Sequence, residues 1–196
     1  TVTNQGAGNI ASEVEANHTL KLTPAANWFG SEGFQIKASD GGKTTTATIT
    51  VTVASINDPP TVKTTIAPFS MNEGATDKHL NLGNVFNDVD NPTLTYTFTG
   101  QVNLNVSIAN KIVSIVSPIG WNGIENITFK ATDTSGLFTT ALAKVTVKHV
   151  NHAPTVKTKI GDKVLAGDST DTSINLNNVF SDIDNDPLAF AATGNA

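Results

Sequence analysis

The sequence contains no cysteine and no arginine, and only 6% of its residues are aromatic. Without cysteine there can be neither a disulfide scaffold nor a thiolate metal site. The lack of arginine and the formal net charge of −5 argue against binding to nucleic acid or to an anionic membrane surface. No apolar run approaches the roughly 20 residues that a membrane-spanning helix needs. We therefore expect no nucleic-acid partner and no membrane insertion in this segment.

The chain is rich in residues that build strands and turns. It is 38% hydrophobic and 15% charged, which is typical of a globular protein rather than a disordered one. Threonine makes up roughly one residue in seven. Threonine favours strands and asparagine favours turns. The composition therefore predicts an all-β protein with little or no helix.

An internal repeat organises the sequence. Three pairs of segments match in order, spacing and residue type, namely 57–64 with 151–158, 80–90 with 174–184, and 24–40 with 118–133. The first two pairs are offset by 94 residues, and the third is offset by 94 or by one residue less. A unit of that length has the usual size of a β-sandwich. The repeat therefore predicts sandwiches in tandem.

The repeat divides the chain into three units. Residues 57–150 form a complete unit, residues 1–56 match only the C-terminal part of a unit, and residues 151–196 match only the N-terminal part. We therefore expect a segment of a longer array, in which flanking residues complete the outer units. An alternative is a polymer in which residues 151–196 of one chain complete the sandwich begun by residues 1–56 of the next, since strand donation between subunits is physically sound.

Short segments alternate between apolar and polar residues, which is the pattern of half-buried strands. In residues 46–53, Ala47, Ile49, Val51 and Val53 share one face, and threonines occupy the other. The second copy repeats this pattern, and its expected inward residues are Ala141, Ala143, Val145 and Val147. The pattern predicts a seven-stranded sandwich for residues 57–150. We expect Trp28 and Trp121 to close one end of a sandwich rather than to form a sugar-stacking platform.

Acidic residues gather at the expected ends of strands and in the linker between the first two units. The candidate ligands at this first junction are Asp40, Asn57, Asp58, Glu73, Asp88 and Asp90. We expect their carboxylates to converge, and such a cluster is repulsive unless a cation compensates it. Calcium takes six to eight oxygen ligands from carboxylates, amides and carbonyls, and it tolerates loop-built sites better than magnesium does. The pattern therefore predicts a calcium site, although acidic turn residues alone would also explain each single aspartate.

The second junction repeats this pattern with departures. Its candidate ligands are Asp133, Asn151, Asp182 and Asp184, with Asp186 as an additional acid. His152 stands where the first junction has Asp58, and Gly167 stands opposite Glu73. Neutral imidazole is a poor calcium ligand. We therefore expect a weaker calcium site at this junction.

Several of these motifs resemble those of cadherin repeats. The linker 57–60 (NDPP) looks like the cadherin linker, Asp40 ends an Ala-x-Asp element, Asp88 and Asp90 form an Asp-x-Asp element, and Glu73 is similar to the early glutamate of the family. The best resemblance is to bacterial and archaeal cadherin-like repeats, including dystroglycan-type relatives. It implies immunoglobulin-like Greek-key sandwiches in a linear array, with calcium at the junctions, in a large surface protein.

These observations favour a structural and adhesive role outside the cell or on its surface. The expected partners are neighbouring repeats of the same chain, with surface glycans or other cell-surface proteins as further candidates. The four histidines are isolated and show no zinc or catalytic-triad spacing, so we expect no enzyme in this segment. The alternative is a carbohydrate-binding accessory module of a secreted polysaccharide-degrading enzyme, which would require an exposed aromatic platform.

Overall fold

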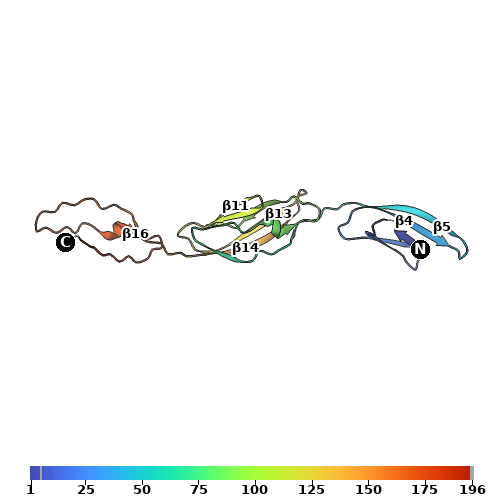
Figure 1. Cartoon of the computed structure of the whole chain (residues 1–196), viewed down its shortest axis with the longest axis horizontal. Helices are drawn as coiled ribbons and strands as arrows, with labels where there is room; N and C mark the ends of the chain where they lie inside the picture. The colour runs from blue at the N-terminus through green and yellow to red at the C-terminus, as the bar shows by residue number, and fades with distance from the viewer. Residues whose placement is uncertain (5, 195–196) are drawn as a thin grey trace.

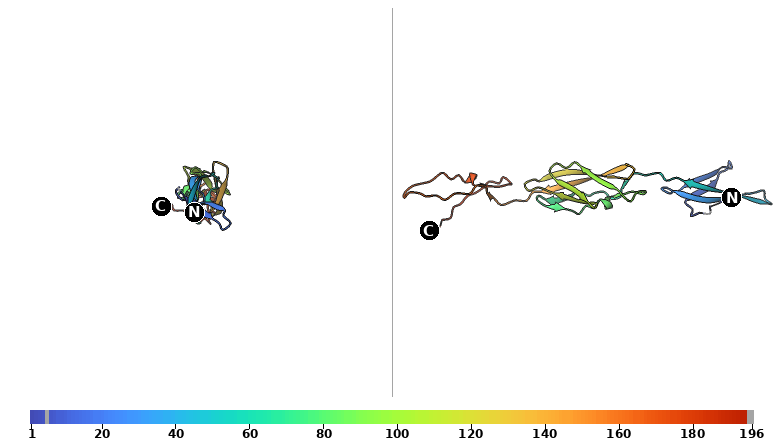
Figure 2. Two further views of the ribbon diagram at one scale, coloured as in Figure 1. Left: turned by 90° about the vertical axis from the view of Figure 1, so that its right-hand side faces the viewer. Right: turned by 90° about the horizontal axis from the view of Figure 1, so that it is seen from above.

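A computed structural model describes residues 1–4 and 6–194, and it shows three units in a row (Figure 1). The middle unit is the largest body, and the two outer units extend from its opposite ends (Figure 2). Almost all regular structure is β-strand, as the composition predicted. Within the described residues, no helix has the length and apolar character needed to cross a membrane.

The middle unit consists of two antiparallel-dominated sheets. The four-stranded sheet has the order β10 (Thr95–Thr99), β13 (Gly123–Thr132), β14 (Phe138–Lys148) and β7 (Phe69–Asn72). The three-stranded sheet has the order β11 (Asn105–Ala109), β12 (Ile112–Val116) and β8 (Thr76–Asp77). These two sheets together contain seven strands, the number predicted for the sandwich, although the unit as a whole has two further short strands. A short ribbon of β6 (Thr61–Val62) and β9 (Phe86–Asn87) and the one-turn helix α1 (Leu82–Val85) complete the unit.

The main hydrophobic core lies inside the middle unit. Ala141, Ala143, Val145 and Val147 are buried on one face of β14, whereas the residues between them are exposed or half-exposed. Phe129 on the neighbouring β13 is fully buried in the same cluster. The two-residue alternation therefore places one face of the sheet in the core and turns the other face, with its threonines, its lysines and the exposed Leu142, to solvent.

The first unit repeats the same strands with a thinner core. It contains a sheet of β1 (Val2–Asn4), β4 (Gly30–Ser39) and β5 (Thr44–Val53), and a ribbon of β2 (Ile10–Val14) and β3 (Leu20–Pro24). On β5, Ile49, Val51 and Val53 are only half-buried, and Ala47 is exposed, contrary to its expected inward position. Among the described residues β5 is the edge strand of its sheet, whereas β14 is flanked by both β13 and β7, so β5 has fewer packing partners than β14.

The third unit contains little regular structure. It consists of the ribbon of β15 (Thr155–Val156) and β16 (Phe180–Ser181) and the 3-10 turn η1 (Leu176–Asn178). Val179 is its buried apolar residue within the described part of the chain. Most of the buried apolar residues therefore lie in the middle unit.

Each repeated Trp-x-Gly motif forms a tight contact at the start of a strand. A Cβ atom on Gly30 would lie 3.0 Å from the Trp28 ring, and one on Gly123 would lie 3.2 Å from the Trp121 ring. The indole therefore lies directly on the glycine, where any side chain would compete for the space. Trp121 also packs against the core, as expected for a residue that closes one end of the sandwich.

Candidate metal sites at the two junctions

The first junction ties the linker to two loops of the middle unit. Asn57 lies at its centre, because its Nδ2 donates to Asp133 Oδ2 at 2.7 Å and its Oδ1 accepts from Asn91 Nδ2 at 2.7 Å. The backbone N–H of Asp58 donates to Asp90 Oδ2 at 2.6 Å. These bonds hold three aspartates and two asparagines close together. The side-chain groups that they offer to an ion are carboxylates and amides.

Asp88 carries one oxygen that has no hydrogen-bond partner. Its Oδ1 accepts the N–H groups of Asp90 at 2.8 Å and Asn91 at 2.7 Å, which shapes the loop between β9 and β10. Its Oδ2 is buried and accepts no hydrogen bond from the described part of the chain. A buried carboxylate oxygen without a partner costs free energy, and such an atom calls for an explanation in a folded protein. A bound cation would provide the missing partner.

Asp133 is held in its ionised form. The hydrogen bond from the Asn57 amide is the main cause that lowers the pKa of this buried carboxyl group. Burial alone would raise the pKa, but the N–H groups of Ser135 and Leu137 lower it further, so the pKa lies below its usual range. At neutral pH the residue is therefore a carboxylate that carries negative charge at the linker. Both Asp133 and Asp88 fit the donor set of a hard divalent cation.

A pocket of about 260 Å³ opens between the first and middle units. Its lining includes the acidic residues Asp58 and Asp90 and the apolar residues Trp28, Phe29 and Ile56. Carboxylates of the middle unit and apolar side chains of the first unit therefore share one cleft. The cleft gives solvent and small ions access to the acidic end of the middle unit.

The structure does not bring Asp40 or Glu73 to the first junction, and the expectation that they converge there is wrong. Asp40 lies in the hairpin between β4 and β5, where it accepts the N–H groups of Gly42 and Lys43. The linker follows the far end of the ten-residue strand β5, about 33 Å away for an extended strand. The tip of a hairpin and the end of its second strand lie at opposite poles of a sandwich. The linker to the next unit follows the second strand, so an aspartate at the hairpin tip lies at the other pole, beside the linker that precedes its own unit.

Asp133 illustrates the same rule in the middle unit. It occupies the hairpin position of Asp40, and its contact with Asn57 places it at the first junction rather than the second. Asp133 therefore joins the first junction and leaves the ligand set that was predicted for the second.

Glu73 lies at the second junction, at the opposite pole of the middle unit. Its Oε1 accepts the backbone N–H of Val150 at 2.6 Å and lies 2.9 Å from His149 Nδ1, while its Oε2 accepts the N–H of Gly120. The Val150 bond lowers the pKa of Glu73; burial opposes this, and the bonds from Gly120 and His149 add to the lowering. Glu73 is therefore a carboxylate at neutral pH, with its side chain 0% exposed.

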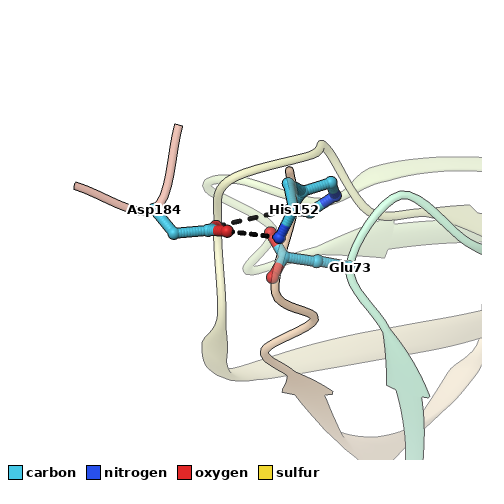
Figure 3. Close-up of side chains that lie close together, drawn as sticks. All are labelled: Glu73, His152 and Asp184. Carbon is cyan, nitrogen blue, oxygen red and sulfur yellow. Dashed lines mark hydrogen bonds and ion pairs between the residues drawn. The ribbon is translucent and has the colours of Figure 1, made fainter. Parts of the chain in front are cut away.

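Asp184 of the third unit meets this cluster from the other side (Figure 3). Its Oδ2 accepts the N–H of His152 at 2.6 Å, and its Oδ1 lies 3.3 Å from His152 Nδ1 and 3.9 Å from His149 Nδ1. The His152 bond is the main cause of a lowered pKa of Asp184. Ligand atoms of Glu73, His152 and Asp184 all lie within 4.8 Å of one another.

The remaining predicted ligands of the second junction are more open. Asp182, Asp184 and Asp186 form a second acidic group, with carboxylate oxygens within 4.8 Å of one another. Asp182 Oδ1 accepts the N–H of Asp184 at 2.8 Å, which repeats the turn made by Asp88 and Asp90. Asn151 is exposed. The two units also touch directly here, because a Cβ atom on Gly120 would lie 3.0 Å from Ile183.

Sequence reasoning missed two features of these junctions. It did not single out Asn91, which bridges the loop to the linker, and it treated His149 and His152 as isolated. That interpretation is wrong, since both imidazoles contact Asp184 across the junction. Their His-x-x-His spacing beside the linker was the available signal, and only the partners from distant loops give it meaning.

The fold and the repeated junctions define a tandem array of immunoglobulin-like β-sandwich domains. Residues 1–52 and 57–146 match the family model described as bacterial Ig domain, and the chain therefore belongs to that family. Domains of this family are non-catalytic modules, which also occur within enzymes, and they typically belong to secreted or surface proteins. No curated protein matches the chain.

Several solved structures are similar to this chain at low sequence identity. Human mucin-like protocadherin is 18% identical with a TM-score of 0.49, over 76% of this chain and 84% of that one. Protocadherin gamma B2 is 14% identical with a TM-score of 0.46, over 82% of this chain and 35% of that one. An endo-fucoidan hydrolase from glycoside hydrolase family 107 is 19% identical with a TM-score of 0.37, over 75% of this chain and 28% of that one. The chain thus spans about a third or less of the last two structures, and these likenesses concern the fold alone.

Proposed function

We propose that this chain is a calcium-stiffened structural and adhesive segment of a large extracellular or cell-surface protein. The observation that carries the proposal is the buried Oδ2 of Asp88, which has no hydrogen-bond partner in the described part of the chain and lies at a junction rich in carboxylates and side-chain amides. Candidate ligands there are Asn57, Asp58, Asp88, Asp90, Asn91 and Asp133. The proposed ion is calcium, because loop carboxylates and amides suit its flexible coordination.

Calcium at this position would restrict the linker. Asp58 belongs to the linker itself, whereas Asp88 and Asp133 belong to two different loops of the middle unit. An ion shared between them cross-links the segment through which the first unit moves relative to the middle unit. Extracellular calcium modules bind with dissociation constants of roughly 0.1–1 mM, which matches the calcium supply outside cells.

A rigid array suits a spacer or filament that presents a binding tip. Its proposed partners are the neighbouring repeats of the same chain, with surface glycans or other cell-surface proteins at the tip. The second junction should bind calcium less well, because His152 replaces Asp58. The proposal includes no catalytic step in this segment.

The test compares Asp88→Asn with Asp40→Asn in the full 196-residue chain. Asp40 is the matched control because it is an aspartate of the repeated motif that lies away from both junctions. We expect calcium at ten times its dissociation constant to stabilise the wild type and Asp40→Asn by about 1.4 kcal/mol. Small-angle scattering should also show that calcium increases the average maximum dimension of these two proteins and narrows the spread of their conformations. Asp88→Asn should lose both responses, and retention of both by that variant would contradict the proposal.

A further inference from the structure

The second junction offers imidazole nitrogens where the first offers only oxygens. His152 stands beside the carboxylates of Glu73 and Asp184, which come from the middle and third units respectively (Figure 3). His149 also lies within 2.9 Å of Glu73 Oε1 and 3.9 Å of Asp184 Oδ1. We propose that these four residues form a site for a divalent transition ion of the zinc type, so that the two junctions respond to different ions. This inference rests on the proposed function only in taking the junctions as ion-stiffened.

The spacing of the four side chains suits four-coordinate binding. A tetrahedral ion with bonds of about 2.0–2.1 Å places its ligand atoms roughly 3.3–3.4 Å apart. The distances that join these groups are 2.9 Å from His149 Nδ1 to Glu73 Oε1, 3.3 Å from His152 Nδ1 to Asp184 Oδ1, and 3.9 Å from His149 Nδ1 to Asp184 Oδ1. These three distances lie on either side of the required edge. Glu73, His152 and Asp184 already have ligand atoms within 4.8 Å of one another, and His149, which stands outside that group, contacts Glu73 and Asp184 and would join it by rotation of its ring.

The two carboxylates are fixed before any ion binds. The N–H groups of Val150 and Gly120 orient Glu73, and the N–H of His152 orients Asp184. Such outer hydrogen bonds hold metal ligands in place and tune their basicity. The side chains of Glu73 and Asp184 are 0% and 2% exposed, so the carboxylates of the site are shielded from solvent.

The two imidazoles form the open side of the site. The side chain of His149 is 48% exposed and that of His152 is 29% exposed. An ion can therefore arrive from solvent, and either ring can turn to present a nitrogen. Metal binding at the Nδ1 atom of a neutral imidazole is common chemistry.

The donor set discriminates between ions. Calcium prefers oxygen ligands in high number, whereas imidazole with carboxylate suits zinc and the neighbouring first-row ions. The replacement of Asp58 by His152 at the equivalent position therefore weakens calcium binding and favours zinc. Because Glu73 and Asp184 belong to adjacent units, zinc bound here would cross-link the middle unit to the third.

The experiment is a zinc titration of the untagged, metal-stripped 196-residue chain, followed by calorimetry, in calcium that occupies the first junction. We expect one zinc ion per chain. The double variant His149→Ala/His152→Ala should weaken binding at least about 100-fold, since removal of direct ligands exceeds the 10–100-fold cost of outer-shell changes. Both rings are partly exposed, so this variant should keep the fold, which circular dichroism would verify. His18→Ala and His79→Ala are the matched controls, and each should bind zinc like the wild type.

Cobalt provides an independent readout of the ligand set. Cobalt(II) should give the intense visible absorption of a tetrahedral site in the wild type and not in the double variant. Equal zinc affinity of the double variant and the wild type, or no zinc binding by the wild type, would overturn the inference. The calcium response and its loss in Asp88→Asn are measured separately, so failure of the zinc site would leave the calcium proposal standing, and the reverse also holds.

Discussion

At the scale of single residues, the buried carboxylates have two different roles. Glu125 accepts the backbone N–H groups of Val102, Asn103 and Leu104 and so anchors the loop that leads into β11. In the first unit, Glu32 accepts the N–H groups of Asn9 and Ile10 at the matching place. These glutamates accept hydrogen bonds from their own unit, unlike Asp88, whose Oδ2 has no hydrogen-bond partner in the described part of the chain.

We predict that Glu125→Gln lowers the free energy of unfolding by about 2 kcal/mol, because a charged acceptor of several hydrogen bonds is replaced by an amide whose NH₂ group faces backbone donors. Urea unfolding of the variant measures this change, and the exposed Glu13→Gln is the control that should stay close to wild type. Burial raises the pKa of Glu125, but the hydrogen bonds outweigh it and the pKa is lowered overall.

The sign of this shift adds a pH dependence to the same prediction. A carboxyl group with a folded-state pKa below its unfolded value stabilises the fold above the unfolded pKa, and the contribution is lost as the pH falls towards the folded pKa. The difference between wild type and Glu125→Gln should therefore shrink below the ordinary titration range of glutamate. A difference that is independent of pH would contradict the role of the Glu125 charge.

At the scale of elements, turns and hairpins decide which side chains reach the poles. The hairpin between β13 and β14 carries Asp133 to the linker, and the end of β14 carries His149 and Val150 to Glu73. Gly100 ends β10 with φ +97°, and a Cβ atom there would lie 2.5 Å from the backbone oxygen of Asn126. Glycine at this position lets the chain turn away from β13 directly after β10 ends.

We predict that Gly100→Ala destabilises the middle unit by about 3 kcal/mol, because it combines an unfavourable positive φ with a backbone clash. Gly136→Ala separates the two effects, since Gly136 has φ +91° but no atom within 4 Å of the added Cβ. It should cost only about 1 kcal/mol. Thermal unfolding measures both variants, and equal losses would show that the clash at Gly100 is relieved by a shift of the backbone.

At the scale of the whole molecule, three units of unequal packing stand in a row. Fully buried aliphatic and aromatic residues concentrate in the middle unit, whereas the first unit buries Ile10 and Phe34, and the third buries Val179. Local stability follows the density of buried contacts. The junctions therefore connect a well-packed body to two looser ones.

We predict a matching gradient of amide hydrogen exchange along the 196-residue chain. The amides of β13 and β14 should exchange most slowly, those of β4 and β5 at intermediate rates, and those of residues 157–173 fastest, because few buried contacts cover them. Mass spectrometry of peptides after exchange measures this order. Protection of residues 157–173 equal to that of β14 would be inconsistent with the packing seen here.

The sequence by itself determined the repeat, the all-β class and the loops that carry the acids. Local patterns suffice for these features, because alternation, turn residues and repeat spacing act over a few neighbouring positions. The inward face of β14 and the Asp88–Asp90 turn were predictable for the same reason.

Only the tertiary structure decided which pole each side chain occupies. Asp40 and Asp133 end equivalent strands. Because the following strand runs back towards the next unit, both aspartates lie at the end of their unit that faces the preceding linker. Glu73, His149 and Asp184 meet because two units and a linker converge, and no local pattern encodes a contact between residues that are 76 or more positions apart, as in the Glu73–His149 pair. The composition of each candidate metal site depends on that convergence, since the ligands of an ion are set by their position in space rather than by their order in the chain.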